Sequence, residues 1–146
     1  MDQASQISTK PKKIKLDFKD SKYATGRRKR SIAKVWVKKG SGNIHVNGLK
    51  MNEYFKRPVH QIIVTRPLEI SEVATSYDVK CSVSGGGLSG QAGAIILGIS
   101  KALISHDEGL KKNLKKDKLT TRDSRVVERK KYGHRKARRS FQFSKR

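Results

Sequence analysis

The stretch from residue 77 to residue 104 constrains the fold more than any other part of the chain. Tyr77 to Val83 alternates apolar with polar or charged residues, which predicts a half-buried strand. A glycine-rich run from Gly85 to Gly90 follows, and Ala92 to Ile104 then reads as a helix that is apolar nearly all round. Other elements must cover such a helix, so we expect it to form the centre of a single hydrophobic core.

Two further strands are expected earlier in the chain. Ser31 to Lys38 alternates apolar with charged residues, and the Gly40–Asn43 segment predicts a hairpin turn into a second strand at Ile44 to Val46, antiparallel to the first. Trp36 is either a stacking platform for a base or a packed aromatic. Aromatic residues in strands mostly pack against a core, so we favour packing.

The segment between these strands and the glycine run reads as helical. Met51 to Lys56 predicts a short helix, and Pro58 and Pro67 are expected to divide the next stretch into two more short helices. Cys81 stands in the alternating strand with no base near it in sequence. We therefore interpret it as a small buried hydrophobe and not as a reactive thiol.

Charge decides which partners suit the chain. Of its 146 residues 35 are Lys or Arg and 12 are Asp or Glu, which gives a formal charge of +23. This balance favours a polyanionic partner, with nucleic acid first and an anionic membrane second. No apolar run approaches the roughly 20 residues of a spanning helix, and no signal-peptide pattern opens the sequence. We expect a soluble, intracellular protein without a membrane partner.

The composition divides the chain into three parts. Residues 1–22 are polar and Lys-rich, which predicts a disordered arm; its acids and lack of Arg disfavour a transit peptide. Residues 23–107 are expected to form the globular domain. Residues 108–146 read as a basic extension and tail with too few apolar residues for a second core, weakly held without a partner.

Gly85, Gly87 and Gly90 fit the G-x-G-x-x-G dinucleotide pattern, and Asp107 lies 20 residues beyond Gly87. A true fingerprint acid ends a second parallel strand, whereas Lys-rich sequence follows here, and no Gly-Lys-Ser or Gly-Lys-Thr completes a P-loop. We therefore expect no nucleotide cofactor. Free backbone amides at a helix start would suit an RNA phosphate, and a tight strand-to-helix turn explains the glycines equally well; both can hold.

Catalytic patterns are missing from the sequence. No carboxylate pair, Ser-His-Asp set or Cys-His pair stands out, and the four histidines show no ligand spacing. We expect no enzymatic activity, no metal, no cofactor and no small-molecule substrate.

Arg-dense clusters occur at both ends of the predicted core. Arg27 to Arg30 precedes the first predicted strand, and a second series runs from Arg122 to the C-terminus. Clusters of this size predict strong, salt-sensitive RNA binding, because each neutralised phosphate releases counterions. A solvated charged face is the alternative explanation, but for Arg-dense blocks at both ends of a small core we favour RNA contact. A free DNA-associated protein and, on the glycine run alone, a nucleotide-dependent enzyme are the competing functions.

Several motifs, in one order, carry a family resemblance. They are Ala24-Thr25-Gly26-Arg27-Arg28-Lys29-Arg30-Ser31-Ile32-Ala33-Lys34-Val35, Asn47-Gly48 with Tyr54-Phe55, Gly85 to Ala94, Thr121 to Arg125, Glu128 to Lys131, Lys136 to Arg139, and the closing Gln142-Phe143-Ser144-Lys145-Arg146. Together they resemble the universal small-subunit ribosomal protein nine family, in its bacterial or organellar form. The resemblance covers residues 23–146.

The resemblance implies a two-layer α+β domain, with a small mixed sheet packed on helices as in the second domain of ribosomal protein S5. It places the chain in a prokaryotic, cytoplasmic ribosome or alternatively in a mitochondrial or other organelle ribosome. The partners it implies are small-subunit rRNA in the head, neighbouring head proteins and the anticodon stem-loop of peptidyl-site tRNA.

Site residues follow from the same resemblance together with the charge pattern. Those expected to bind rRNA are Arg27, Arg28, Lys29, Arg30, Gly86, Gly87, Gln91, Arg122, Arg125, Arg129, Lys130, Lys131, Arg135, Lys136, Arg138 and Arg139. Those expected to meet tRNA are Ser144, Lys145 and Arg146. The chain departs from the family pattern at Lys34 and Ile96, where basic residues of the family would contact rRNA, and at Ser140-Phe141, where a stiffening proline is frequent.

Overall fold

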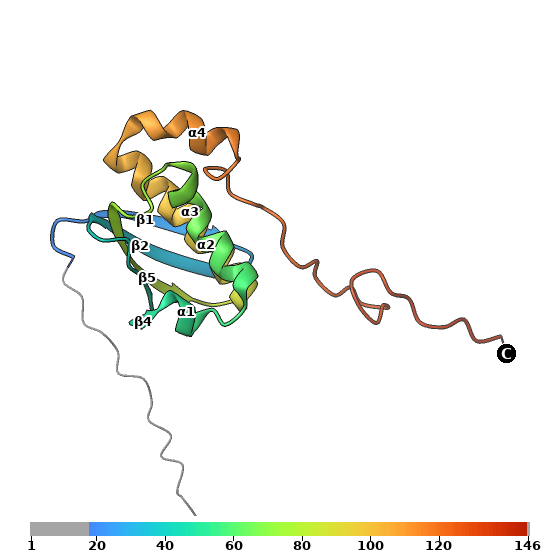
Figure 1. Cartoon of the computed structure of the whole chain (residues 1–146). Coiled ribbons are helices and arrows are strands. Elements are labelled where there is room, and N and C mark those ends of the chain that lie inside the picture. The colour runs from blue at the N-terminus through green and yellow to red at the C-terminus, as the bar shows by residue number, and fades with distance from the viewer. Residues whose placement is uncertain (1–17, 146) are drawn as a thin grey trace, which may run out of the picture.

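The structure, a computed structural model, describes residues 18–145 and consists of one sheet with helices on one side and a long tail (Figure 1). Its elements in chain order are β1 (Lys22–Arg28), β2 (Ser31–Lys39), β3 (Ile44–Val46), β4 (Leu49–Lys50), α1 (Met51–Tyr54), α2 (Pro58–Ile70), β5 (Tyr77–Ser84), α3 (Leu88–His106), the 3-10 helix η1 (Glu108–Leu110) and α4 (Lys111–Lys116). The predicted two-layer α+β architecture is confirmed.

The sheet is mixed, as expected, but its strand order differs from the prediction. The order is β1-β2-β5-β3-β4, with β3 parallel to β5 and all other neighbours antiparallel. The predicted hairpin between β2 and β3 is therefore wrong, because β5 lies between them. The Asp78 carboxylate of β5 accepts hydrogen bonds from the backbone N–H groups of Ser41 and Asn43, at 3.0 and 2.9 Å. The turn after β2 thus folds around the start of β5.

A strand that sequence reasoning missed forms one edge of the sheet. β1 contains Arg27 and Arg28, which were expected to precede the first strand, and it pairs with β2 from Lys22↔Val37 to Arg28↔Ser31. Lys29 and Arg30 form the turn of this hairpin. Gly26 lets β1 pack directly on α3, since a Cβ at this position would collide with the carbonyl oxygen of Ala94.

The core lies between the sheet and the helices and is centred on α3, as predicted. Ile95, Ile99 and Leu103 of this helix are fully buried, and they belong to one cluster with inward residues of β2 and β5. By length and composition α3 could also cross a membrane, at 19 residues and a mean hydropathy of 1.3, but most of it is buried in the domain. Cys81 is buried as predicted, and burial raises the pKa of its thiol.

Two helices differ from expectation. Pro67 was expected to divide the 58–70 segment, yet α2 runs through it from Pro58 to Ile70. The proline removes one helical hydrogen bond, and burial of Pro67 and Leu68 in the domain offsets this cost. After α3, α4 packs back on the domain. Leu114 is fully buried in the same core, although its neighbours in α4 are mostly lysines.

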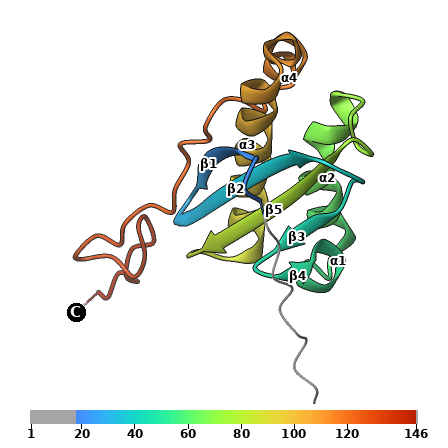
Figure 2. The same ribbon diagram turned by 90° about the vertical axis from the view of Figure 1, so that its left-hand side faces the viewer.

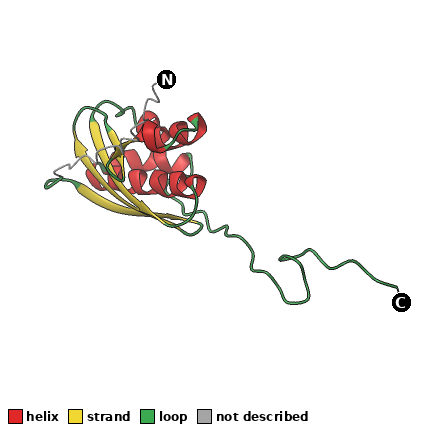
Figure 3. Cartoon of the chain, turned by 90° about the horizontal axis from the view of Figure 1, so that it is seen from below, coloured by secondary structure: helices red, strands yellow, loops and turns green. Residues whose placement is uncertain are grey.

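Within the part of the chain that the structure describes, the helices cover one face of the sheet and leave the opposite face without helices. Figure 2 looks onto the strands with α3 behind them, and Figure 3 shows the helices gathered on one side of the sheet. Residues 117–145 contain no helix or strand apart from an isolated bridge between His134 and Ser140, and they lead away from the domain (Figure 1).

Candidate nucleic-acid interface

The β1–β2 hairpin presents the first basic cluster. Arg27 is exposed on the face of the sheet away from the helices, and Lys29 and Arg30 are exposed in the turn. Arg28 points the other way, because neighbouring strand residues alternate between faces, and it is half-buried beside α3. Three of the four cations therefore face solvent, and the fourth is used inside the protein.

Arg28 holds the beginning of the tail. Its side chain crosses α3 at Gly93, where a Cβ would collide with it, and its Nη2 lies 3.3 Å from Asp123 Oδ2. Asp123 also accepts hydrogen bonds from Nε, Nη2 and the backbone N–H of Arg125, each at 3.0 Å. We call Arg28, Asp123 and Arg125 the tail anchor.

The anchor's electrostatics favour an ionised Asp123. The side-chain hydrogen bonds from Arg125, its backbone N–H and the nearby charge of Arg28 hold the pKa of the Asp123 carboxyl well below its usual value. Sequence reasoning did not single out Asp123. One feature of the sequence could have identified it: Asp123 is an acid between Arg122 and Arg125, in a segment where almost every other charge is positive.

Side-chain hydrogen bonds fix the glycine loop beside the hairpin. Ser31 Oγ and Gln91 Nε2 both donate to the carbonyl oxygen of Gly85, each at 3.1 Å, and Tyr54 Oη donates to Gln91 Oε1 at 2.7 Å. Gly86 has φ +60°, and a side chain there would also collide with Ser31. Both polar ends of Gln91 are engaged within the protein, so its contact with rRNA stays a prediction and its visible role is to support the loop.

The start of α3 is open to solvent. Gly87 is the N-cap, no side chain caps the helix there, and Leu88 and Ser89 are exposed. Uncapped amides at a helix start carry partial positive charge and accept anions. Asp107, the acid of the dinucleotide pattern, instead ends α3 and accepts a hydrogen bond from the Gly109 N–H at 2.9 Å. Within residues 18–145 no strand follows α3, so the second half of a dinucleotide fold is not formed there.

A groove of about 750 Å³ brings the two basic clusters together. Its lining comes from the hairpin turn, the glycine loop and the first part of the tail: Lys29, Arg30, Gly86, Gly87, Val126, Val127, Glu128, Arg129 and Lys130. Glu128, the acid among these residues, is paired with Arg138 at 3.0 Å and Lys131 at 3.9 Å. The groove therefore offers cations and free amides to an anionic ligand.

Beyond the groove the tail is exposed almost throughout. Arg138 is hydrogen-bonded to Glu128 with its side chain still 88% exposed, and the Arg135 guanidinium lies 5.5 Å from the Phe141 ring centroid. Lys131 is half-buried. The other predicted tail residues in the described part are exposed: Arg122, Arg125, Arg129, Lys130, Arg135, Lys136, Arg138, Arg139, Ser144 and Lys145. Arg146 lies outside the described residues.

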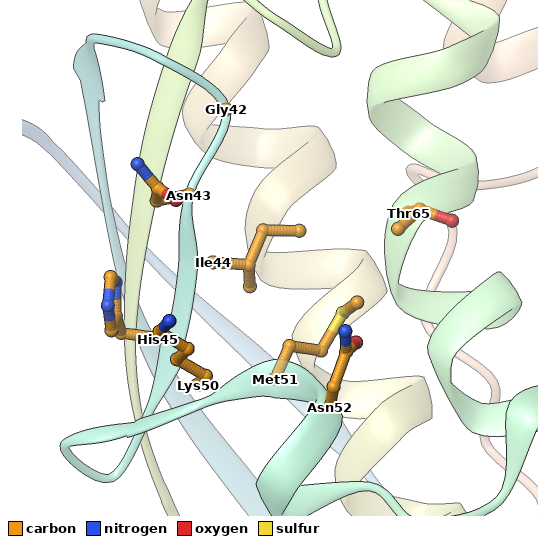
Figure 4. Close-up of a pocket in the computed structure, with 8 residues that line it drawn as sticks. All are labelled: Gly42, Asn43, Ile44, His45, Lys50, Met51, Asn52 and Thr65. Atoms are coloured by element: carbon orange, nitrogen blue, oxygen red, sulfur yellow. The ribbon is translucent and has the colours of Figure 1, made fainter.

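A second, smaller cavity of about 220 Å³ lies between β3, β4 and α2 (Figure 4). In the figure Ile44 lies between β3 and α2, Thr65 comes from the facing side of α2, and His45 points to the other side of β3. The lining contains one lysine, Lys50, and no Arg. This cavity is separate from the basic groove and contains none of the predicted site residues.

Comparison with known families gives a match over most of the chain. The family model described as "Ribosomal protein S9/S16" matches residues 26–146, which includes the β1–β2 hairpin, the glycine loop, the anchor and the whole tail. The match begins within β1 and thus leaves out residues 1–25.

Proposed function

Because the chain belongs to the ribosomal protein S9/S16 family, whose members bind rRNA in the small subunit, we propose that its tail reaches peptidyl-site tRNA. The chain is a structural ribosomal protein with rRNA and ribosomal proteins as partners, in a cytoplasmic or an organelle ribosome. The proposal assigns different RNA partners to different parts of the chain. The domain and the first part of the tail bind rRNA, and the last residues meet the anticodon stem-loop of tRNA in the peptidyl site.

The basic groove is the proposed centre of rRNA binding. An RNA backbone lying along it would place phosphates against Lys29, Arg30, Arg129 and Lys130 and against the uncapped amides of α3. The further tail cations as far as Arg139 would continue this contact. Lysine and arginine suit the task because phosphate recognition depends on charge and on donors that can adapt to the RNA backbone.

The exposed tail is the observation that carries the tRNA proposal. After the anchor no described side chain of the tail is buried, and Phe143, which would pack if the tail folded on the domain, is 87% exposed. A chain that is rich in cations and lacks its own core gains order from a polyanion. Ser144 and Lys145 are the last described residues, at the end of the tail that lies farthest from the domain (Figure 1).

The test is to remove residues 144–146 and to measure tRNA affinity at the peptidyl site of assembled small subunits. The deletion takes away two cations, Lys145 and Arg146, so the matched control replaces two exposed cations of α4, Lys111→Ala with Lys112→Ala. We expect the deletion to weaken tRNA binding, the control to leave it unchanged, and both proteins to assemble. Unchanged tRNA affinity after the deletion would overturn the proposal.

A further inference from the structure

The face of the sheet opposite the helices carries a continuous row of aromatic and cationic side chains. Cross-strand pairing joins Tyr23 to Trp36, Trp36 to Lys80, Lys80 to His45, and His45 to Lys50. The row thus crosses all five strands. At the usual spacing of about 4.8 Å between strands it spans roughly 19 Å.

The aromatic end of the row is partly accessible, with Trp36 half-buried and Tyr23 more exposed. Tyr23 is 49% exposed, and its ring centroid lies 5.3 Å from that of Trp36 with the planes tilted by 43°. Lys80 Nζ lies 5.8 Å from the ring centroids of both Trp36 and Phe18, so Phe18 from the segment before β1 also lies on this face. Trp36 is not part of the buried core, so the interpretation that it packs there is wrong: the odd-numbered residues of β2 face α3, and Trp36 faces away.

The charge around the row favours an anion. Arg27, Lys34 and Lys38 are exposed on the same face, whereas Asp78 is the one carboxylate in the five strands and is held by the turn at Ser41 and Asn43. A second copy of this chain, at +23, would be repelled. Residues 1–17, which precede the sheet in sequence, are themselves Lys-rich and so do not complement it in charge.

We propose that this sheet face is a second RNA-binding surface, on which unpaired bases stack on Tyr23 and Trp36 while Arg27, Lys34 and Lys38 contact their phosphates. A sheet whose aromatic residues stack two or three bases is a general solution for single-stranded RNA. A duplex does not fit this chemistry, because its bases are already stacked on each other. The surface shares no residue with the tail, so the proposal goes beyond the tRNA contact and does not depend on it.

Trp36 makes the proposal directly testable, because it is the only tryptophan in the chain. Its fluorescence in the full-length protein would be followed during titration with a single-stranded oligouridylate, an RNA duplex of equal length and inorganic polyphosphate. The titration is run at high salt, where phosphate contacts of the tail weaken and stacking persists. We expect saturable quenching by the single strand and little by the other two. No quenching, or equal quenching by polyphosphate, would overturn the proposal.

A variant identifies the surface. Tyr23→Leu should weaken single-strand binding at high salt by about 5- to 150-fold, the range for losing one stacked base. Phe143→Leu is the matched control, because it removes an exposed aromatic of the tail and should leave Trp36 quenching intact. An equal effect of both variants on quenching would contradict a role for the sheet face.

Cross-linking in the assembled subunit would identify which molecule contacts the sheet face. Ultraviolet cross-linking followed by mass spectrometry should yield a peptide containing Trp36 or Tyr23 attached to an rRNA nucleotide. A cross-link of these residues to a neighbouring protein would overturn the proposal and identify a protein-docking face. Truncation at residue 143 separates the two proposals, since it removes the tail end and leaves every residue of the row in place.

Discussion

The domain and the tail contain the same types of basic residue, arginine and lysine, but these residues have different surroundings in the two regions. In the domain Arg28 is half-buried, lies against Gly93 and faces Asp123, so its charge is balanced within the protein. In the tail the Arg138 side chain is 88% exposed, and a single acid, Glu128, serves both Arg138 and Lys131. Hydrophobic burial holds the domain together, whereas the tail gains little free energy until RNA neutralises it. Substitutions in the two regions should therefore act on different measurable quantities.

The largest effect is expected in the core. Leu103→Ala would remove a fully buried side chain from α3 and should lower the free energy of unfolding by about 2–5 kcal/mol. Phe143→Ala in the tail is the contrast, because this ring is 87% exposed and its loss should change stability by less than about 0.5 kcal/mol. Urea unfolding of the full chain measures both. Comparable destabilisation by the two variants would show that the tail packs on the domain.

The contact between β1 and α3 should be nearly as sensitive. Gly26→Ala would place a methyl group against the carbonyl oxygen of Ala94 and should cost about 1–3 kcal/mol, since backbone has to move. Gly87→Ala is the matched control, because an added Cβ there meets no atom within 4 Å. Thermal unfolding should therefore place the melting temperature of Gly26→Ala below that of Gly87→Ala. Equal values would contradict the close packing of β1 on α3.

Substitutions in the tail should change the salt dependence of rRNA binding and leave the stability of the fold unchanged. Replacing Arg129 and Lys130 with alanine should reduce the slope of log K against log salt for rRNA binding by about 1.4–1.8, at roughly 0.7–0.9 for each lost phosphate contact. If the two proteins bind equally at 1 M salt, this slope corresponds to binding that is about 14- to 30-fold weaker at 0.15 M salt. Lys111→Ala with Lys112→Ala removes the same charge outside the groove. An equal change of slope for both pairs would show that the groove acts only through the general positive charge of the protein and is not a localised rRNA-binding site.

The smallest effect is expected at the anchor and depends on pH. The folded-state pKa of Asp123 lies below its ordinary value of 3.8, so the anchor is fully present at neutral pH, starts to weaken below about pH 4 and is lost as the pH falls through the folded pKa. Nuclear magnetic resonance of the Arg125 amide, which donates to Asp123, would follow this change. Asp123→Asn should abolish the titration and alter stability little, because the pair is near the surface. A midpoint at or above pH 4 would contradict the anchor.

Local patterns in the sequence were enough for the elements with clear periodicity. The strands around Val35 and Val79 and the apolar helix through Ile99 repeat their apolar residues at the spacing of the structure. The pairing of strands was not predictable in the same way. Inserting β5 between β2 and β3 depends on contacts such as Asp78 with Ser41, 37 residues apart in sequence, which no local window contains.

Sequence reasoning missed three structural features because they lie among charged residues. β1 was missed because Arg27 and Arg28 read as part of a cluster and Gly26 weakened the strand pattern. Leu114 packs in the core although it stands among lysines, so the core includes a residue beyond the domain boundary predicted at residue 107. Asp123 was overlooked for the same reason. The cations of the site could be predicted, because charge density is a property of sequence, but their meeting in one groove could not.

Photocross-linking from the end of the tail is the most direct test of the division between domain and tail. Ser144→Cys would introduce an exposed thiol of nearly the same size and retain Lys145 and Arg146, while Cys81 is buried and stays unreactive. A thiol-linked photoprobe at this position, in small subunits with tRNA in the peptidyl site, should cross-link to the anticodon stem-loop. The same probe at Lys112→Cys on α4 should not reach tRNA. Cross-links from residue 144 to rRNA or protein alone would contradict the proposed reach of the tail.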